Sequence, residues 1–150
     1  ISLLPAAYVL FTTPGTLIWS FDGWIVWLFR GVQLIGLVSL GVSLLQVDAG
    51  RFAGLAQVRA YINGTDLPLP DEPLVTSGLY GWVRHPLYLF SLLILWFTPS
   101  MTSTGLMFVI ASTLYFTIGS ILEERTMIAI FGETYKQYQA NVPWMLPFVK

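Results

Sequence analysis

The chain has 150 residues, of which 55% are hydrophobic and 10% are charged, well below the roughly 25% charged residues of a soluble domain. Its formal net charge of −1 excludes the basic surface of a nucleic-acid-binding protein. It has no cysteine and one histidine, which excludes disulfides, Cys-ligated zinc and a multi-histidine metal site, so we expect no metal.

Apolar stretches predict an all-α integral membrane protein with about four transmembrane helices. A crossing needs about 20 mostly apolar residues, and Trp24–Gln46 is the clearest candidate. Residues 1–19 are a weaker one, because Pro5 and Pro14 interrupt them. Residues 87–122 contain no charge and are too long for one crossing, so they are predicted to cross twice.

This charge-free segment is predicted to form a helical hairpin. Pro99 and the Ser/Thr cluster in FTPSMTSTG (97–105) indicate a tight turn between arms at about 86–98 and 102–122. At about 1.5 Å per residue the first arm is about 20 Å long, which is short for a full crossing. We expect it to tilt or to start within protein below the headgroups.

The stretch after Leu122 is predicted to be an amphipathic cytoplasmic tail helix. Its apolar residues recur every three to four positions, at Met127, Phe131, Tyr135 and Tyr138. Gly132 is a candidate kink, and VPWMLPFVK (142–150) is expected to return to the membrane surface. Ahead of the hairpin, the proline-rich residues 63–78 form an extended loop, long enough to be functional.

Charge placement predicts the orientation. The short connections 20–23 and 99–103 carry no Lys or Arg, whereas six of the seven basic residues lie in residues 47–85 or after Leu122. By the positive-inside rule both of these stretches are cytoplasmic. We expect one membrane domain over residues 1–150 with its core at about 64–150. Because the chain begins with Ile1 and not Met, we also expect that an N-terminal part is missing.

Arg84, His85, Pro86 and Tyr88 form the first candidate constellation. Pro86 suits the first position of a helix, which puts His85 near the N-cap, where free N–H groups bind anions. Arg84 adds a cation, and Tyr88 lies on the same side of the first turn as His85. The group suits a carboxylate or phosphate at the bilayer edge. The alternative is that Arg84 and His85 are interfacial anchors.

Glu123 and Glu124 form the second constellation, at the end of an uncharged helix. A charged side chain near lipid costs free energy and usually has a functional role. Glu123 shares a helical face with Met127 and Phe131, so we expect it to point into the protein, toward the Arg84 group, and to suit a bound cation or amine. A solvated pair at a helix end is the alternative.

Together these segments resemble the isoprenylcysteine carboxyl methyltransferase family. The resemblance covers about residues 69–150 and is carried by SGLYGWVRHPLY (77–88) and LEERTMIAIFGETYKQYQANVPWMLPF (122–148). These contain the family's Arg-His-Pro-x-Tyr box, Glu-Glu pair, Phe-Gly-x-x-Tyr-x-x-Tyr helix and Val-Pro ending, in its order. The resemblance implies an integral membrane enzyme that uses S-adenosyl-L-methionine.

Carried over position by position, the resemblance also implies residue roles. The catalytic candidates are Arg84, His85 and Glu123. Cofactor contacts would fall on Glu72, Pro73, Leu74, Val75, Tyr80, His85, Pro86, Leu87, Tyr88 and Glu123. The proline-shaped loop would wrap the adenosine, and the helix start would take the methionine carboxylate. Methyl transfer from a sulfonium needs alignment and desolvation more than acid–base groups, and no metal.

One position departs from the family pattern. The prenylcysteine enzymes have an arginine one turn before the Glu pair, taken to hold the substrate carboxylate, where this chain has Gly119. A carboxylate substrate thus loses its partner unless Arg125 or Arg84 replaces it, which makes Gly119 and Arg125 candidate substrate positions. FTPSMTSTGLMF and LEER resemble the bacterial branch that S-methylates small thiols. We therefore expect a small thiol or lipid-soluble acceptor, at a site facing the cytoplasm from a bacterial inner membrane.

Other acceptors and another class stay open. Within the family the alternatives are O-methylation of prenylcysteine and N-methylation of a phospholipid. Sterol reductases share the Arg-His-Pro-x-Tyr box and bind NADPH, but they typically carry Asn where Leu87 stands and lack the Glu pair. A reductase is therefore an alternative by fold-level analogy, and a non-enzymatic membrane protein is a third.

Overall fold

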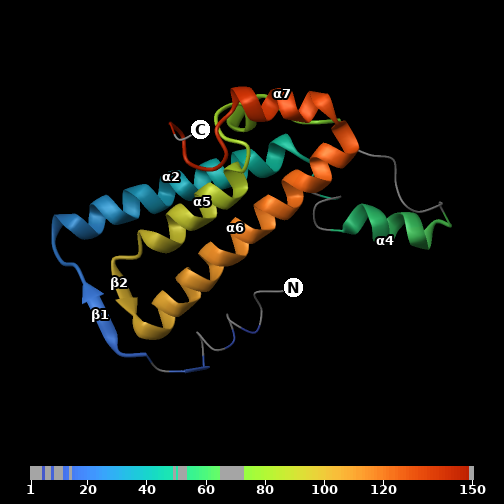
Figure 1. The fold of residues 1–150 in the computed structure, drawn as a ribbon. Coiled ribbons are helices and arrows are strands. Elements are labelled where there is room, and N and C mark those ends of the chain that lie inside the picture. The colour runs from blue at the N-terminus through green and yellow to red at the C-terminus, as the bar shows by residue number, and fades with distance from the viewer. Residues whose placement is uncertain are drawn as a thin grey trace.

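The computed structural model describes residues 15–48, 50, 54–64 and 73–148, together with residues 5, 8, 12 and 13. The helices there are α2 (Trp24–Gln46), α4 (Leu55–Ile62), α5 (Pro86–Trp96), α6 (Ser103–Phe131) and α7 (Glu133–Asn141). A 3₁₀ turn, η1 (Gly78–Gly81), precedes α5, and the strands β1 (Leu17–Ser20) and β2 (Ser100–Thr102) form a ribbon. Figure 1 shows the ribbon at one end of α2, α5 and α6, and α7 at the other.

Two of these helices are long and apolar enough to cross a membrane. α2 has 23 residues and α6 has 29, so at about 1.5 Å per residue both exceed the roughly 30 Å of a hydrocarbon core. α5 has only 11 residues, in line with the predicted short arm. Of the four predicted crossings, the part of the chain that the structure describes contains two of full length.

The predicted hairpin of α5 and α6 is present, with shifted ends. α5 begins at Pro86 in the first helical position. α6 begins at Ser103, where the hydroxyl of Thr102 accepts a hydrogen bond from the Gly105 N–H at 3.1 Å. α6 runs past Leu122 to Phe131 and stops at Gly132, whose φ of 55° lies in the left-handed region that glycine tolerates. The predicted kink at Gly132 is therefore a break between α6 and α7.

Gly36 lets α2 and α5 approach closely. A Cβ at this position would lie 2.9 Å from Cγ1 of Ile94 and 3.3 Å from the carbonyl oxygen of Phe90. Small residues at membrane helix interfaces allow the close van der Waals contact that holds such helices together. In addition, Nε2 of Gln33 donates to the Ile94 carbonyl at 3.0 Å. The short helix α5 thus packs closely along the long helix α2 and is hydrogen-bonded to it.

The described part of the chain is mostly helical, as predicted, with one short β-ribbon that the prediction did not include. β1 pairs antiparallel with β2, with Trp19 opposite Met101. The predicted first crossing through residue 19 is wrong at its end, because a short apolar stretch with Ile18 and Trp19 suits a strand as well as a helix. Nε1 of Trp19 donates to the Thr98 carbonyl at 3.3 Å, which ties the ribbon to the hairpin turn. Most of that predicted crossing lies outside the described residues.

The other end of the bundle is closed by α7 and by residues 142–148, which we call the C-terminal strap. Tyr135 and Tyr138 of α7 are buried, as their spacing predicts. The strap passes the start of α5, where the Arg84 N–H donates to the carbonyls of Pro143 and Trp144 at 2.9 and 3.0 Å. Residues 73–76, which form neither helix nor strand, lead into η1. Residues 65–72 of the predicted proline-shaped loop lie outside the described residues.

Candidate active site

The turn before Arg84 is fixed by Gly78 and Gln46. Gly78 has a φ of 61°, in the left-handed region that favours glycine, and a Cβ there would displace the amide of the Gln46 side chain. Oε1 of Gln46 accepts from the Leu79 N–H at 3.1 Å. The last residue of α2 therefore sets the position of η1, and η1 leads directly into the Arg84-His85-Pro86 triplet.

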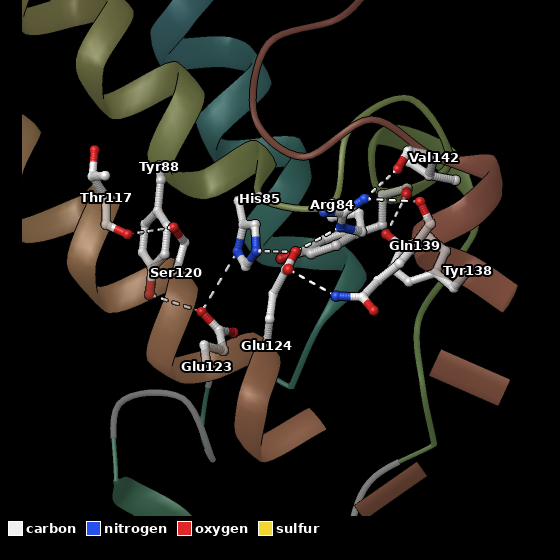
Figure 2. A network of polar contacts seen from close by, with 11 residues as sticks. Arg84, His85, Tyr88, Thr117, Ser120, Glu123, Glu124, Tyr138, Gln139 and Val142 are labelled. Atoms are coloured by element: carbon white, nitrogen blue, oxygen red, sulfur yellow. Dashed lines mark hydrogen bonds and ion pairs between the residues drawn. The ribbon is translucent and has the colours of Figure 1, made fainter. Parts of the chain in front are cut away.

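Arg84 joins three segments (Figure 2). Its Nε donates to Oε1 of Glu124 at 2.6 Å, and its Nη1 donates to the carbonyls of Gln139 and Val142 at 3.1 and 2.6 Å. Nε2 of Gln139 donates to the other oxygen of Glu124 at 2.8 Å. The Arg84 and Glu124 side chains are only 11% and 15% exposed. These N–H groups of Arg84 thus hold α6, α7 and the strap together.

His85 lies between two carboxylates. Its Nε2 is 3.2 Å from Oε1 of Glu124, and its Nδ1 is 3.6 Å from Oε2 of Glu123. Burial lowers the pKa of His85 below its ordinary value of 6.5, although the charges of Glu123 and Glu124 oppose the shift. The imidazole is therefore neutral at physiological pH. Its ring stacks on Tyr88 with centroids 5.5 Å apart.

The two glutamates lie on either side of His85, because adjacent helical residues point about 100° apart. Glu123 is 44% exposed and accepts from the Tyr88 hydroxyl at 2.9 Å. As predicted, it lies beside His85. The partner of Arg84, however, is Glu124, which is the more buried of the two. Sequence spacing selects Glu123 for the site but does not reveal this role of Glu124.

A cavity of about 380 Å³ lies beside these side chains. This volume falls within the range of about 300–1,000 Å³ that is typical of small-molecule sites. Four helices form part of the walls: α4, the start of α5, the end of α6 and α7. The residues that follow α2 and residues 73–75 complete them. The lining residues are Val47, Asp48, Gln57, Pro73, Leu74, Val75, Tyr80, Arg84, His85, Leu87, Glu123, Met127, Ile130, Phe131, Tyr135 and Tyr138.

A smaller cavity of about 30 Å³ adjoins the larger one. The two share Tyr80, Arg84, His85, Leu87 and Glu123, and Pro86 and Tyr88 complete the lining of the smaller. Burial, followed by the nearby charge of Glu123, raises the pKa of Tyr80 to about 12, so its hydroxyl stays protonated. The cavities therefore meet at His85, Glu123 and Tyr80.

Tyr138 links the loop before α5 to α7. Its hydroxyl donates to the Tyr80 carbonyl. Burial raises the pKa of Tyr138 and that of Tyr135, so both rings remain neutral donors. One wall of the larger cavity is thus held by a side-chain contact and not only by chain connectivity.

The structure brings most of the predicted site residues to these cavities. The predicted residues that line one or both cavities are Pro73, Leu74, Val75, Tyr80, Arg84, His85, Pro86, Leu87, Tyr88 and Glu123. Glu72 lies outside the described residues. Gly119 and Arg125 line neither cavity, although a Cβ on Gly119 would lie 4.0 Å from the Tyr88 hydroxyl. Gly119 is therefore near the smaller cavity.

Several lining residues were not among the predicted site residues. The packed helical face predicted after Leu122 supplies four of them: Met127, Phe131, Tyr135 and Tyr138. Because helical spacing places Glu123 on that same face, the same spacing also favours these four as site residues. Val47 and Asp48, directly after α2, and Gln57 in α4 also line the cavity. They lie in VDAGRFAGLAQV (47–58), a stretch that loosely resembles a segment of the thiol-methylating branch, but they were not predicted as site residues.

A model of the isoprenylcysteine carboxyl methyltransferase (ICMT) family matches residues 37–129. The chain belongs to this family. The matched region runs from α2 through nearly all of α6 and contains both the Arg84-His85-Pro86 triplet and the Glu pair. The resemblance read from the sequence is thereby confirmed, and ICMT family membership with two apolar helices indicates a membrane protein.

Related proteins extend the match beyond the ICMT core. The chain is 37% identical over 132 residues to methanethiol S-methyltransferase 2 of Bradyrhizobium diazoefficiens, covering 88% of this chain and 50% of the relative. It is 36% identical over 139 residues to methanethiol S-methyltransferase of Crocosphaera subtropica, covering 90% and 52%. It is 38% identical over 88 residues to protein-S-isoprenylcysteine O-methyltransferase of Xenopus laevis, covering 53% and 29%. The chain thus spans about half the length of the two bacterial relatives.

Proposed function

We propose that the protein is an integral membrane methyltransferase that uses S-adenosyl-L-methionine and methylates a small thiol. The observation that carries this proposal is the cavity where Arg84 and His85 of the family's Arg-His-Pro box meet Glu123 of its Glu pair. When bound, the donor supplies a methyl group activated on a sulfonium. The protein's own contribution is then to align the acceptor with that methyl group and to exclude water.

The residues around the larger cavity fit the chemical groups of this donor. The free N–H groups in the first turn of α5, next to Leu87, suit its carboxylate. The Glu123 carboxylate suits its ammonium group or ribose hydroxyls. Tyr80, Phe131 and Tyr135 offer ring faces and edges for the adenine. Pro73, Leu74 and Val75, which line the same cavity, would cover the adenosine.

Three observations favour a small thiol as the acceptor. The smaller cavity, about 30 Å³, leaves little room beside His85 and Tyr88. Gly119 brings no side chain, and hence no cation, to the Tyr88 hydroxyl. The methanethiol S-methyltransferases of Bradyrhizobium diazoefficiens and Crocosphaera subtropica match 88% and 90% of the chain, against 53% for the Xenopus laevis prenylcysteine relative.

We assign the cavity to the cytoplasmic side of a bacterial inner membrane. Arg84, Arg125 and Lys136 lie at its end of the bundle, in keeping with the positive-inside rule. At the opposite end, α2 begins with Trp24 and Trp27, which are 73% and 78% exposed. Exposed tryptophans suit the outer interfacial belt of a membrane protein.

The decisive experiment is a radiolabelled-methyl transfer assay with detergent-purified protein. The acceptor panel contains methanethiol, longer thiols, a prenylcysteine and phosphatidylethanolamine. We expect the label on methanethiol, whereas label on the prenylcysteine or the phospholipid would move the proposal to one of these lipid acceptors. No transfer to any acceptor, with NADPH bound in place of S-adenosylhomocysteine, would refute it.

Calorimetry with S-adenosylhomocysteine tests the donor site separately. Glu123→Gln removes the charge that faces the ammonium group, so we expect at least about tenfold weaker binding, in the range of one lost charged hydrogen bond. Glu133→Gln is the matched control, because Glu133 is 78% exposed and, among the described residues, forms its ion pair with Lys136 on the same helix. Equal affinities of the two variants would contradict the proposed role of Glu123.

A further inference from the structure

The hydrogen bond to Glu124 fixes the tautomer of His85. A carboxylate only accepts hydrogen bonds, so Nε2, 3.2 Å from Oε1 of Glu124, carries the hydrogen of the neutral ring. Nδ1 therefore presents a lone pair. Its separation of 3.6 Å from Oε2 of Glu123 is longer than the roughly 2.7–3.2 Å of an N–H···O bond. The basic nitrogen of His85 is thus the one on the Glu123 side, where the two cavities meet.

We propose, resting on the thiol methylation proposed above, that Nδ1 of His85 accepts the proton of the acceptor thiol. Glu124 is the positioning residue that keeps His85 in the tautomer able to do so. Methyl transfer to a neutral thiol requires this proton to leave. The thiol sulfur forms a bond to the methyl carbon, the bond from that carbon to the sulfonium sulfur breaks with its electron pair, and the S–H proton moves to Nδ1.

The charge balance of the site favours this assignment. The step neutralises one positive charge, on the sulfonium, and creates one, on the imidazole, so the net charge of the cavity is unchanged. The new imidazolium lies between the carboxylates of Glu123 and Glu124, at 3.6 and 3.2 Å. Both charges stabilise it. The adjacent Arg84 and the burial of His85 oppose it, so the proton is released again after the product leaves.

The smaller cavity fits the acceptor of such a step. Its volume of about 30 Å³ is far below the roughly 300–1,000 Å³ of sites for larger ligands, so it suits a small group such as the shortest alkyl thiol. His85, Tyr88 and Glu123 line this cavity, which places a bound sulfur beside the imidazole and next to the larger cavity that we assign to the donor.

The kinetic test uses two acceptors of nearly equal size, methanethiol and methaneselenol. The selenol is ionised at neutral pH and needs no base, whereas the thiol does. His85→Gln can still donate to Glu124 through its amide but has no basic nitrogen. We expect this variant to lose at least about a hundredfold in kcat/KM with the thiol, the usual contribution of a general base, and less than tenfold with the selenol. We also expect its rate with the thiol to rise with pH.

The structural test reads the tautomer directly. His85 is the only histidine in the sequence, so ¹⁵N-histidine labelling of protein with a histidine-free tag gives one imidazole in the NMR spectrum. We expect the Nε2–H tautomer in wild type. Glu124→Gln, whose amide oxygen still accepts from Nε2–H, should keep this tautomer, whereas Glu124→Ala should give a mixture and a larger loss with the thiol than with the selenol.

The outcomes separate this inference from the proposed function. Failure of wild-type protein to bind S-adenosylhomocysteine or to methylate either acceptor refutes the function and the inference together. Normal methylation by wild type, with equal losses for thiol and selenol in His85→Gln, refutes only the inference, because it shows that the thiol ionises before it binds. An Nδ1–H tautomer in wild type also overturns it.

Discussion

Nε of Arg84 donates to Oε1 of Glu124 at 2.6 Å, which joins the residue before His85 to the end of α6. The same guanidinium donates to the carbonyls of Gln139 in α7 and Val142 just after it, so one side chain closes the end of the bundle. Because the ion pair is mostly buried, neither partner can be removed without leaving the other uncompensated.

Arg84→Ala or Glu124→Ala should therefore destabilise the fold by about 3–5 kcal/mol, as when one partner of a buried pair is lost. The measurement is thermal or denaturant unfolding in detergent. The exposed pair of Glu133 and Lys136 is the control, at an equal distance of 2.6 Å. Glu133→Ala should change stability by less than about 1 kcal/mol. A similar loss at both sites would show that the Arg84 pair is no more than a surface contact.

The contact of α2 with α5 gives a second prediction. Gly36→Ala places a methyl group 2.9 Å from Ile94 and should push the helices apart, at a cost of about 1–3 kcal/mol. Gly41, on the same helix, has nothing within 4 Å of its would-be Cβ. Gly41→Ala should therefore be neutral or stabilising by up to about 1 kcal/mol. Thermal unfolding of the two variants checks this, and equal effects would rule out the close approach.

Gly119 gives a prediction about acceptor choice. The space there admits a side chain, since only the Tyr88 hydroxyl lies within 4.0 Å of the would-be Cβ. In Gly119→Arg the guanidinium should reach Glu123, four residues on, and fill the smaller cavity. Methanethiol turnover should then fall by at least about tenfold, as a filled pocket predicts. The affinity for S-adenosylhomocysteine should fall as well, because the guanidinium occupies the Glu123 carboxylate. Gly119→Ala is the control and should retain turnover.

The pKa of His85 predicts how stability depends on pH. Because this pKa is lower in the folded protein than its ordinary 6.5, the unfolded chain takes up the proton first as the pH falls. The stability that comes from a neutral His85 is thus complete above about pH 6.5 and is lost as the pH falls toward the lower folded value. The ionisable groups facing the ring are Arg84, Tyr88, Glu123 and Glu124.

His85→Gln should remove this part of the pH dependence. Melting temperatures recorded from pH 7.5 to pH 5 should fall in the wild type and fall less in the variant. The titration of the two glutamates remains in both proteins and is the common baseline. Parallel curves would show that His85 is already protonated in the folded state.

The site was more predictable from the sequence than the membrane topology. Pro86 marks the start of a helix, and spacing sets Glu123 on the same face as Met127, so two local rules converge on one cavity. The role of Glu124 depends on Gln139 and Val142, which meet Arg84 only in three dimensions. Hydropathy identified α2 and α6 but did not anticipate β1. A stretch of a few apolar residues is too short for its periodicity to distinguish a strand from a helix.

The C-terminal strap has a consequence for biosynthesis. The N–H groups of Arg84 and His85 donate to the carbonyls of Pro143 and Trp144, and the guanidinium of Arg84 donates to the carbonyl of Val142. These acceptors follow α2, α5 and α6 along the chain, so the three helices are synthesised before the groups that join their ends. The pocket is therefore completed only after residues 142–144 have been translated.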